Sequence, residues 1–331
     1  MAIKKDFLEG IQQDVSDVLA TKFEYLNTNN VPTRSDAALT FERGVLKRGK
    51  ILKTCVIYVD IRNSVELTSK HSAETMGQLY TAFGKSMVKA AKQHNGHVRN
   101  IIGDRVMIIF PVENCFVNAF DCALSINYIA SEIINKQFSN VDFKCGIGID
   151  YGELKVIKVG RQRRGDEAVE NRSLVWTGFP ANIASRLTDV ANKIVKETYF
   201  QVIKQPYNPY SSPLFNSLLA TTQFPLSAPS NQPTYSAQTQ EIELTAEEFI
   251  GKLEDYKGEL KIGFDKVVSF KKLTRNISFP AILMTEIVYK GIKNADPNRK
   301  SFTNSYLLEQ KGVIKNVKTK VYGGDILWGF N

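Results

Sequence analysis

The chain has 331 residues, of which 43% are hydrophobic and 23% are charged, so it is long enough for two domains with a sizeable core. No apolar run approaches the roughly eighteen residues of a membrane-spanning helix, and residues 1–7 lack the apolar region of a signal peptide, so we expect a cytoplasmic protein. The net charge of +9 favours polyanionic partners, while no basic motif interleaved with aromatic residues indicates a nucleic-acid site.

The first fifty residues predict an amphipathic helix and a lead-in strand. Apolar side chains recur at helical spacing over residues 5–25, which is typical of a helix that packs in a core or a dimer interface. Pro32 and the asparagines before it end that pattern, and a basic strand or loop follows over residues 38–53.

Two carboxylates come next, each at the end of a predicted strand. An apolar strand ends on Asp60 and continues into a turn and a helix, and residues 97–110 predict a hairpin with Gly103 and Asp104 at its tip. An aspartate beside a glycine is also common in turns for backbone reasons alone. Two convergent carboxylates, however, are the hard oxygen ligands that Mg²⁺ or Mn²⁺ prefers.

Helices and strands then alternate in a recognisable order. Helices are predicted over residues 73–94 and 117–137, and strands over 144–149 and 152–159. The result is a β-α-β-β-α-β arrangement, which is an α+β, ferredoxin-like fold with an antiparallel-rich sheet and helices on one face. All four cysteines lie in apolar contexts without metal-ligand spacing, so we expect them to be reduced and buried.

The next helix carries Asn182 and Arg186, which are four residues apart and therefore share one face. Such a pair is by itself typical of a solvated face. Six of the eleven prolines then fall between residues 206 and 233, which predicts a linker or long loop over residues 206–240. Helical spacing over residues 244–260 and strand patterns over 262–270, 281–290 and 313–330 predict a folded region at 241–331.

Together these segments resemble the catalytic domain of class III nucleotidyl cyclases, over residues 51–205. Asp60 stands in the family's D-I-x-x-[FS]-x-x-L pattern, Asp104 follows the Ile-Gly tip, and the G-x-x-x-N-x-A-x-R helix begins at Gly178. Residues 145–153 match the family's G-I-x-x-G strand and turn.

The resemblance implies a phosphorus-oxygen lyase that uses two Mg²⁺ or Mn²⁺ ions per active site. It places these ions on Asp60, Asp104 and the backbone carbonyl of Ile61, and it assigns ribose positioning to Asn182 and transition-state stabilisation to Arg186. The triphosphate would contact the amides of a short run of residues: Arg62, Asn63, Ser64 and Val65.

The resemblance also implies how the site is assembled. Asn182 and Arg186 serve the opposite subunit, so one chain type requires a head-to-tail homodimer with shared sites. Residues 160–171 match an arm that reaches toward the partner, or they form a solvated hairpin tip. Lys318 or Lys320 could bind the triphosphate, although surface lysines on an edge strand are common.

The positions that select the base carry neither purine pattern. Adenylate and guanylate cyclases place a lysine or a glutamate where this chain has Asn100, and adenylate cyclases place an aspartate or threonine at Val175. Trp176 could narrow the base pocket or stack on the base, or pack in the core.

This departure resembles the pyrimidine cyclases of bacterial Pycsar antiphage systems, which make cyclic UMP or cyclic CMP to activate a separate effector. We expect UTP to be favoured over CTP as substrate, and residues 241–331 would correspond to their C-terminal, in some cases AGS-C-like, region. The alternatives are a purine-specific cyclase, a diguanylate cyclase or polymerase palm, and an inactive nucleotide-binding module.

Overall fold

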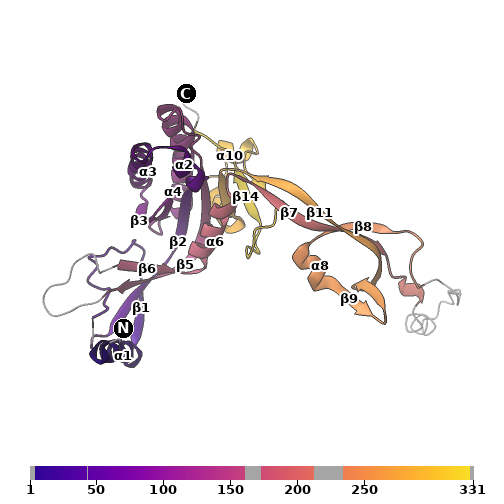
Figure 1. Ribbon diagram of the computed structural model, residues 1–331, viewed down its shortest axis with the longest axis horizontal. Helices are drawn as coiled ribbons and strands as arrows, with labels where there is room; N and C mark the ends of the chain where they lie inside the picture. The colour runs from indigo at the N-terminus through magenta and orange to yellow at the C-terminus, as the bar shows by residue number, and fades with distance from the viewer. Residues whose placement is uncertain (1–3, 43, 161–172, 212–233, 329–331) are drawn as a thin grey trace. The chain divides into compact units, whose positions relative to one another are not determined.

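The computed structural model describes residues 4–42, 44–160, 173–211 and 234–328. They fall into two compact units, one drawn from residues 1–194 and 278–331 and the other from residues 195–277 (Figure 1). The sequence grouped residues 241–331 into one C-terminal region, whereas the structure divides that stretch between the two units. The predicted arm lies outside the described residues except for Gly160, as does the middle of the predicted linker, residues 212–233.

A nine-stranded mixed sheet forms the centre of the first unit, in the order β13-β14-β12-β5-β2-β4-β3, with β1 beside β2 and β6 beside β5. Its described strands are β1 (Phe23–Asn27), β2 (Lys47–Ile61), β3 (His97–Ile102), β4 (Arg105–Ile109), β5 (Cys145–Val159), β6 (Ser173–Thr177), β12 (Ile282–Thr285), β13 (Leu308–Glu309) and β14 (Val321–Gly324). The long strands β2 and β5 pair antiparallel from Lys50–Val156 to Ile61–Cys145. Because this pairing is continuous, β5 is one strand where the sequence predicted two with a turn between them.

Helices cover both faces of this sheet, and the order β2-α3-β3-β4-α4-β5 confirms the predicted α+β arrangement. The helical segments of the first unit are α1 (Lys5–Ala20), α2 (Ser64–Lys70), α3 (Ala73–Gln93), α4 (Cys115–Tyr128), the π-helix η1 (Ile129–Ile134), α5 (Asn135–Gln137), α6 (Phe179–Val190), α9 (Glu286–Ala295) and α10 (Lys300–Thr303). The larger core joins α3, α4 and α9 to one face, and α6 packs on the other, a face that the prediction left uncovered (Figure 1).

Local sequence explains why α3 begins and ends where it does. The Ser72 side chain accepts a hydrogen bond from the Thr75 amide at 3.2 Å, which caps the helix start. Buried side chains at helical spacing, Met76, Leu79, Phe83 and Met87, then fix one face against the sheet. The chain leaves the helix through left-handed Asn95, so the predicted stop at this point is confirmed.

The second unit is a smaller α+β fold with its own core. Its elements are β7 (Lys193–Gln205), the 3₁₀ helix η3 (Pro209–Ser211), β8 (Gln240–Thr245), α8 (Ala246–Lys252), β9 (Leu253–Tyr256), β10 (Glu259–Ile262) and β11 (Asp265–Phe279). The strand order is β8-β7-β11-β10-β9, and Val202, Leu244, Phe249 and Val267 form the buried centre. The helix expected over residues 244–260 is limited to α8, because β9 and β10 pair as a hairpin directly after it.

The four cysteines, Cys55, Cys115, Cys122 and Cys145, are buried and free of disulfides, as the sequence predicted. None of the helices in the described part of the chain is long and apolar enough to cross a membrane.

Candidate active site

The structure brings Asp60 and Asp104 to the same end of the neighbouring strands β2 and β4. Asp60 lies near the end of β2 opposite Arg105, the first residue of β4. Asp104 occupies the tight turn before β4, where Gly103 takes a φ of 60° that a side chain would disfavour. The Ile61 amide donates a 3.3 Å hydrogen bond to the Asp104 carbonyl, so the two acidic residues are backbone neighbours.

A surface depression of about 410 Å³ lies next to these acids. Its lining residues come from α2, α3 and the hairpin tip, namely Ser64, Val65, Thr68, Ser69, Tyr80, Gly103 and Asp104. Burial raises the pKa of Tyr80, and the negative charges of Asp104 and Asp60 raise it further. Both carboxylates therefore act on one hydroxyl group at the rim of this depression.

The backbone amides predicted to bind phosphate differ in whether they already have a hydrogen-bond partner. Ser64 and Val65 form the first turn of α2, whose amides have no partner within the helix, and left-handed Asn63 precedes them. The Arg62 amide, in contrast, donates a 2.8 Å hydrogen bond to the Lys144 carbonyl. The prediction for Arg62 is therefore wrong, because its amide continues the pairing of the chain with the segment before β5.

The Arg62 side chain is turned inward beneath Asp60. Its Nη2 lies 2.8 Å from the Thr188 carbonyl oxygen and 3.3 Å from Oδ2 of Asp60. Burial lowers the pKa of Arg62, and the charge of Asp60 opposes that effect. Gly146 makes room for the guanidinium, since a Cβ there would lie 2.6 Å from Nη2.

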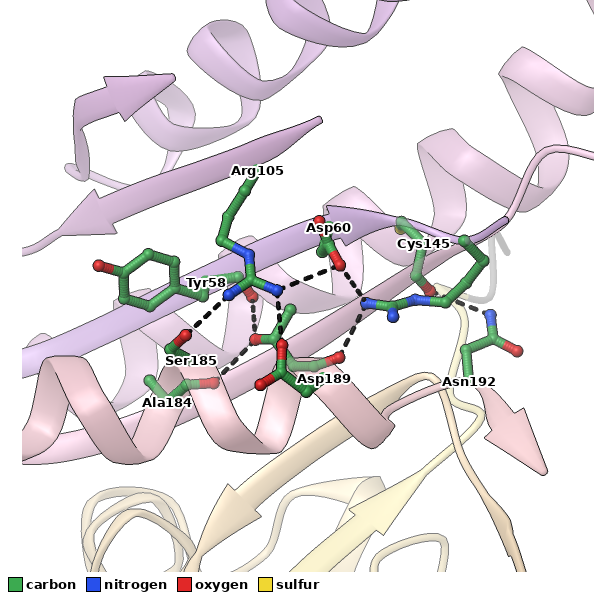
Figure 2. A network of polar contacts seen from close by, with 10 residues as sticks. Tyr58, Asp60, Arg105, Cys145, Ala184, Ser185, Asp189 and Asn192 are labelled. Atoms are coloured by element: carbon green, nitrogen blue, oxygen red, sulfur yellow. Dashed lines mark hydrogen bonds and ion pairs between the residues drawn. The ribbon is translucent and has the colours of Figure 1, made fainter. Parts of the chain in front are cut away.

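A second guanidinium, that of Arg105, connects Asp60 to α6 (Figure 2). Nη2 of Arg105 lies 3.3 Å from Oδ2 of Asp60 and 2.6 Å from Oδ1 of Asp189, and Nη1 donates a 2.8 Å hydrogen bond to Oγ of Ser185. Both arginines approach Oδ2 of Asp60, and no hydrogen bond or ion pair to its Oδ1 occurs within the described ranges.

The donors at this edge suit a hard divalent cation. Asp60 and Asp104 offer carboxylate oxygens, and the open Oδ1 of Asp60 leaves a coordination position beside the two guanidinium groups. Among the described residues no group of three or more His, Cys, Asp or Glu side chains gathers as a metal cage. A metal here would therefore use these two carboxylates, backbone oxygens such as that of Ile61, and its substrate.

Neither Asn182 nor Arg186 forms a hydrogen bond or ion pair with Asp60 or Asp104 in the described part of the chain. Asn182 is exposed, and Nη1 of Arg186 lies 3.4 Å from the Lys315 carbonyl oxygen. The side of α6 directed to Asp60 instead carries Ser185 and Asp189 (Figure 2). One chain therefore does not bring the predicted catalytic pair to its own acidic residues.

Two of the three predicted base-pocket residues meet in a hollow of about 230 Å³. Its lining residues are Thr33, Arg34, Val98, Arg99, Asn100, Ser173, Leu174 and Trp176. Val175 is not among them; its side chain on β6 is exposed, whereas its neighbour Trp176 is buried.

Two residues that line this hollow, Arg99 and Trp176, carry donors without a partner among the described residues. Nε1 of Trp176 and both Nε and Nη2 of Arg99 are buried without a hydrogen-bond partner. Burial lowers the pKa of Arg99. Buried unpaired donors are rare in folded proteins, so Arg99 and Trp176 are candidates to receive a hydrogen-bond acceptor.

The two lysines predicted as possible triphosphate ligands, Lys318 and Lys320, differ in whether they form an ion pair within the described part of the chain. Nζ of Lys320 pairs with Glu309 at 3.0 Å on the antiparallel neighbour strand, and Lys318 is exposed. Their role in binding triphosphate stays a prediction.

Sequence reasoning missed Tyr80, Arg99, Arg105, Ser185 and Asp189. A signal was present for three of them, because Arg105 directly follows Asp104, and Ser185 and Asp189 are one helical turn apart. Tyr80 and Arg99 gave no such signal, since the helix packing and a strand irregularity between Val98 and Asn100 set their positions.

Comparison with known proteins finds similarity to nucleotidyl cyclases. Residues 47–197 match the model of the adenylate and guanylate cyclase catalytic domain. A protein of Burkholderia cepacia named uridylate cyclase is 29% identical over 196 residues, which are 57% of this chain and 80% of that protein. Another uridylate cyclase, from Gulbenkiania mobilis, is 26% identical over 215 residues, covering 61% of this chain and 78% of its own. A cytidylate cyclase of Staphylococcus aureus is 27% identical over 107 residues, which are 30% of this chain and 25% of that protein.

Proposed function

We propose that this chain, whose residues 47–197 match the model of the adenylate and guanylate cyclase catalytic domain, is a class III pyrimidine nucleotide cyclase with UTP as its preferred substrate. The reaction forms a bond between the ribose 3′-oxygen and the α-phosphorus. It breaks the bond from that phosphorus to pyrophosphate, and the 3′-hydroxyl proton is released. The products are 3′,5′-cyclic UMP and pyrophosphate.

The observation that carries the choice of base is that Trp176 and Arg99, which line the hollow at Asn100, have unpaired donors. Uracil presents two carbonyl oxygens, so it can accept from Nε1 of Trp176 and from the Arg99 guanidinium. Cytosine replaces one of these oxygens with an amino group, which would leave a buried donor unpaired at a cost of about 1–3 kcal/mol. The relatives named uridylate cyclase agree with this preference, and the one named cytidylate cyclase makes CTP the second candidate.

Asp60 and Asp104 would hold the divalent cations, with the Ile61 carbonyl as a further ligand. Two Mg²⁺ or Mn²⁺ ions, when bound, lower the pKa of the 3′-hydroxyl and neutralise the triphosphate. The depression beside Asp104 would take the phosphates, with the amides of Ser64 and Val65 as donors.

A second subunit would complete the site. Asn182 would orient the ribose and Arg186 would stabilise the charge that develops on the α-phosphate. Because α6 directs Ser185 and Asp189, not this pair, to its own Asp60, we propose a head-to-tail homodimer with two shared sites. Lys318 is the exposed late lysine that could contact the triphosphate.

In the cell, we propose that cyclic UMP acts in the cytoplasm as a second messenger of antiphage defence and activates a separate effector. Support comes from the Pycsar-like base positions and from the named relatives. The test infects two bacterial cultures with phage, one that carries the unmodified chain and one that carries the Asp60→Ala variant. Cyclic UMP should rise, and the culture should be protected, only with the unmodified chain. A rise without protection would separate the chemistry from the defence role.

The decisive assay supplies each of UTP, CTP, ATP and GTP with Mn²⁺ to the purified protein and identifies the product by mass. Cyclic UMP with pyrophosphate is expected, and loss of turnover in Asp104→Asn would assign it to this site. Preferential turnover of ATP or GTP would refute the pyrimidine assignment. A folded protein that turns over none of the four nucleotides would be an inactive binding module.

A further inference from the structure

The guanidinium of Arg105 is shared unequally between two acids. Its Nη2 lies 2.6 Å from Asp189 and 3.3 Å from Asp60, and Nη1 is fixed 2.8 Å from Ser185 (Figure 2). We propose that Ser185 and Asp189 hold Arg105 on α6 and so keep Asp60 available to a divalent cation. Ser185 and Asp189 are then positioning residues for metal binding, an inference that rests on the proposed metal role of Asp60.

The distances indicate which acid holds the arginine. Ion-paired N–H···O bonds are normally about 2.7–2.9 Å long, so the contact with Asp189 is a full hydrogen bond and the contact with Asp60 is a stretched one. An arginine side chain stays protonated at any ordinary pH. The group therefore stays a cation that competes for carboxylates.

Competition at Asp60 then depends on α6. A divalent cation that binds Asp60 must weaken the pairing of this carboxylate with Arg105. With Asp189 in place, Arg105 keeps its shorter ion pair when the cation binds, so metal binding gives up only the weaker contact with Asp60. Without Asp189, Asp60 is the remaining carboxylate that pairs with Arg105 in the described part of the chain, and the arginine would oppose the metal more strongly.

Arg62 cannot play the same part. Its side chain is only 3% exposed and is tethered to the Thr188 carbonyl, so it remains beside Asp60 whether or not a cation is bound. Arg105 has a side chain that is 31% exposed and ends between two partners, which makes it the adjustable cation of the pair.

The test measures Mn²⁺ binding to the full-length protein without nucleotide, from the electron paramagnetic resonance signal of free Mn²⁺. Asp189→Asn should raise the Kd for Mn²⁺ roughly threefold to tenfold, which corresponds to a modest change in one ion pair. Ser185→Ala should shift it in the same direction by less. The matched control is Asp265→Asn, which removes another aspartate that pairs with a lysine, Lys204, in the second unit.

A double variant makes the test specific to the arginine. Adding Arg105→Gln to Asp189→Asn should restore Mn²⁺ binding to at least the original affinity, because the competing cation is gone. Circular dichroism melts establish that each variant is folded. Unchanged Mn²⁺ affinity in Asp189→Asn, or persistent weakness in the double variant, would overturn this inference alone while cyclic UMP synthesis continued. If Asp60→Asn left Mn²⁺ binding intact, the proposed metal role of Asp60 would fall, and this inference with it.

Discussion

The Thr285 hydroxyl donates a 2.5 Å hydrogen bond to Oδ1 of Asp150 in the interior of the first unit. The bond joins β12 to β5, the strand beside it in the sheet. Burial raises the pKa of Asp150 from an ordinary 3.8 to about 6, although hydrogen bonds from Thr285 and the Tyr151 amide act in the opposite direction. This carboxyl group therefore makes folding sensitive to pH.

The contribution of Asp150 to the free energy of unfolding should fall as the pH rises from about 4 to above 6. In that window the folded protein holds the Asp150 proton and the unfolded chain releases it, so raising the pH favours unfolding by up to about 3 kcal/mol. Asp150→Asn keeps an acceptor for Thr285 without a charge. Thermal melts should show it more stable than the parent at pH 7.5 and no more stable at pH 4, whereas Asp142→Asn on the surface should not reproduce this pattern. Equal pH dependence of the parent and Asp150→Asn would disprove the assignment.

The C-terminal strand β12 should be as important for folding as the strands of the predicted catalytic domain. Ile282 is fully buried there, and Ile287 in the next helix is 48% exposed. Ile282→Ala should lower the free energy of unfolding by about 2–5 kcal/mol, because it leaves a cavity in the core. Ile287→Ala, the same chemical change on the surface, should alter it by less than about 1 kcal/mol. Urea titration measures both, and similar values would contradict the placement of β12.

Two inactive variants should restore activity to each other if the active site is shared. Asp60→Ala removes a proposed metal ligand, and Arg186→Ala removes the arginine that α6 contributes to the other subunit's site. In a mixed dimer, one of the two sites therefore combines an intact Asp60 from one subunit with an intact Arg186 from the other. After subunit exchange, an equal mixture should reach about a quarter of the parent activity, because half of the dimers are mixed and each has one working site. Asp60→Ala mixed with Asp104→Ala is the control, since both changes affect the same side. Exchange without recovery would exclude a site built from two subunits.

Trp176→Phe should reduce the preference for UTP while leaving the apolar packing nearly intact. The change removes the buried Nε1 donor proposed to contact uracil, so kcat/KM for UTP should drop about fivefold to thirtyfold and that for CTP should change little. Trp328→Phe is the matched control, because Nε1 of Trp328 already donates to Oγ of Ser125 at 3.0 Å. An unchanged ratio of the two substrates in Trp176→Phe would refute the role of this donor.

The sequence predicted the parts of the fold whose signals are local. The strand before Asp60, the hairpin tip at Asp104 and the helix α3 each follow from hydrophobic spacing and turn residues that lie close together in the chain. Long-range pairing was harder to foresee, as the unbroken β5 illustrates. Its Asp150 and Gly152 look like turn residues, but pairing with Val56 and Thr54 of β2 holds them in strand conformation.

The same distinction applies to the site. Asp60, Asp104 and α6 could be found from motifs, and the structure brings the two acids together as expected. The partners of Asp60 could not be found in this way. Arg62 was predicted to contribute its amide, but strand pairing occupies that amide and the Gly146 gap accommodates its side chain. Which side of α6 faces Asp60 depends on packing against β2 and β5, which no local pattern records.

The order of strands in the central sheet also has a consequence for biosynthesis. β5 emerges from the ribosome well over a hundred residues before β12, which lies beside it, and the whole second unit is translated in between. Until that late segment arrives, the apolar edge of β5 remains uncovered and Asp150 lacks Thr285. A nascent or prematurely terminated chain would therefore carry both acidic residues and α6 and still be unable to finish its sheet, so the proposed cyclase activity would appear only near the end of translation.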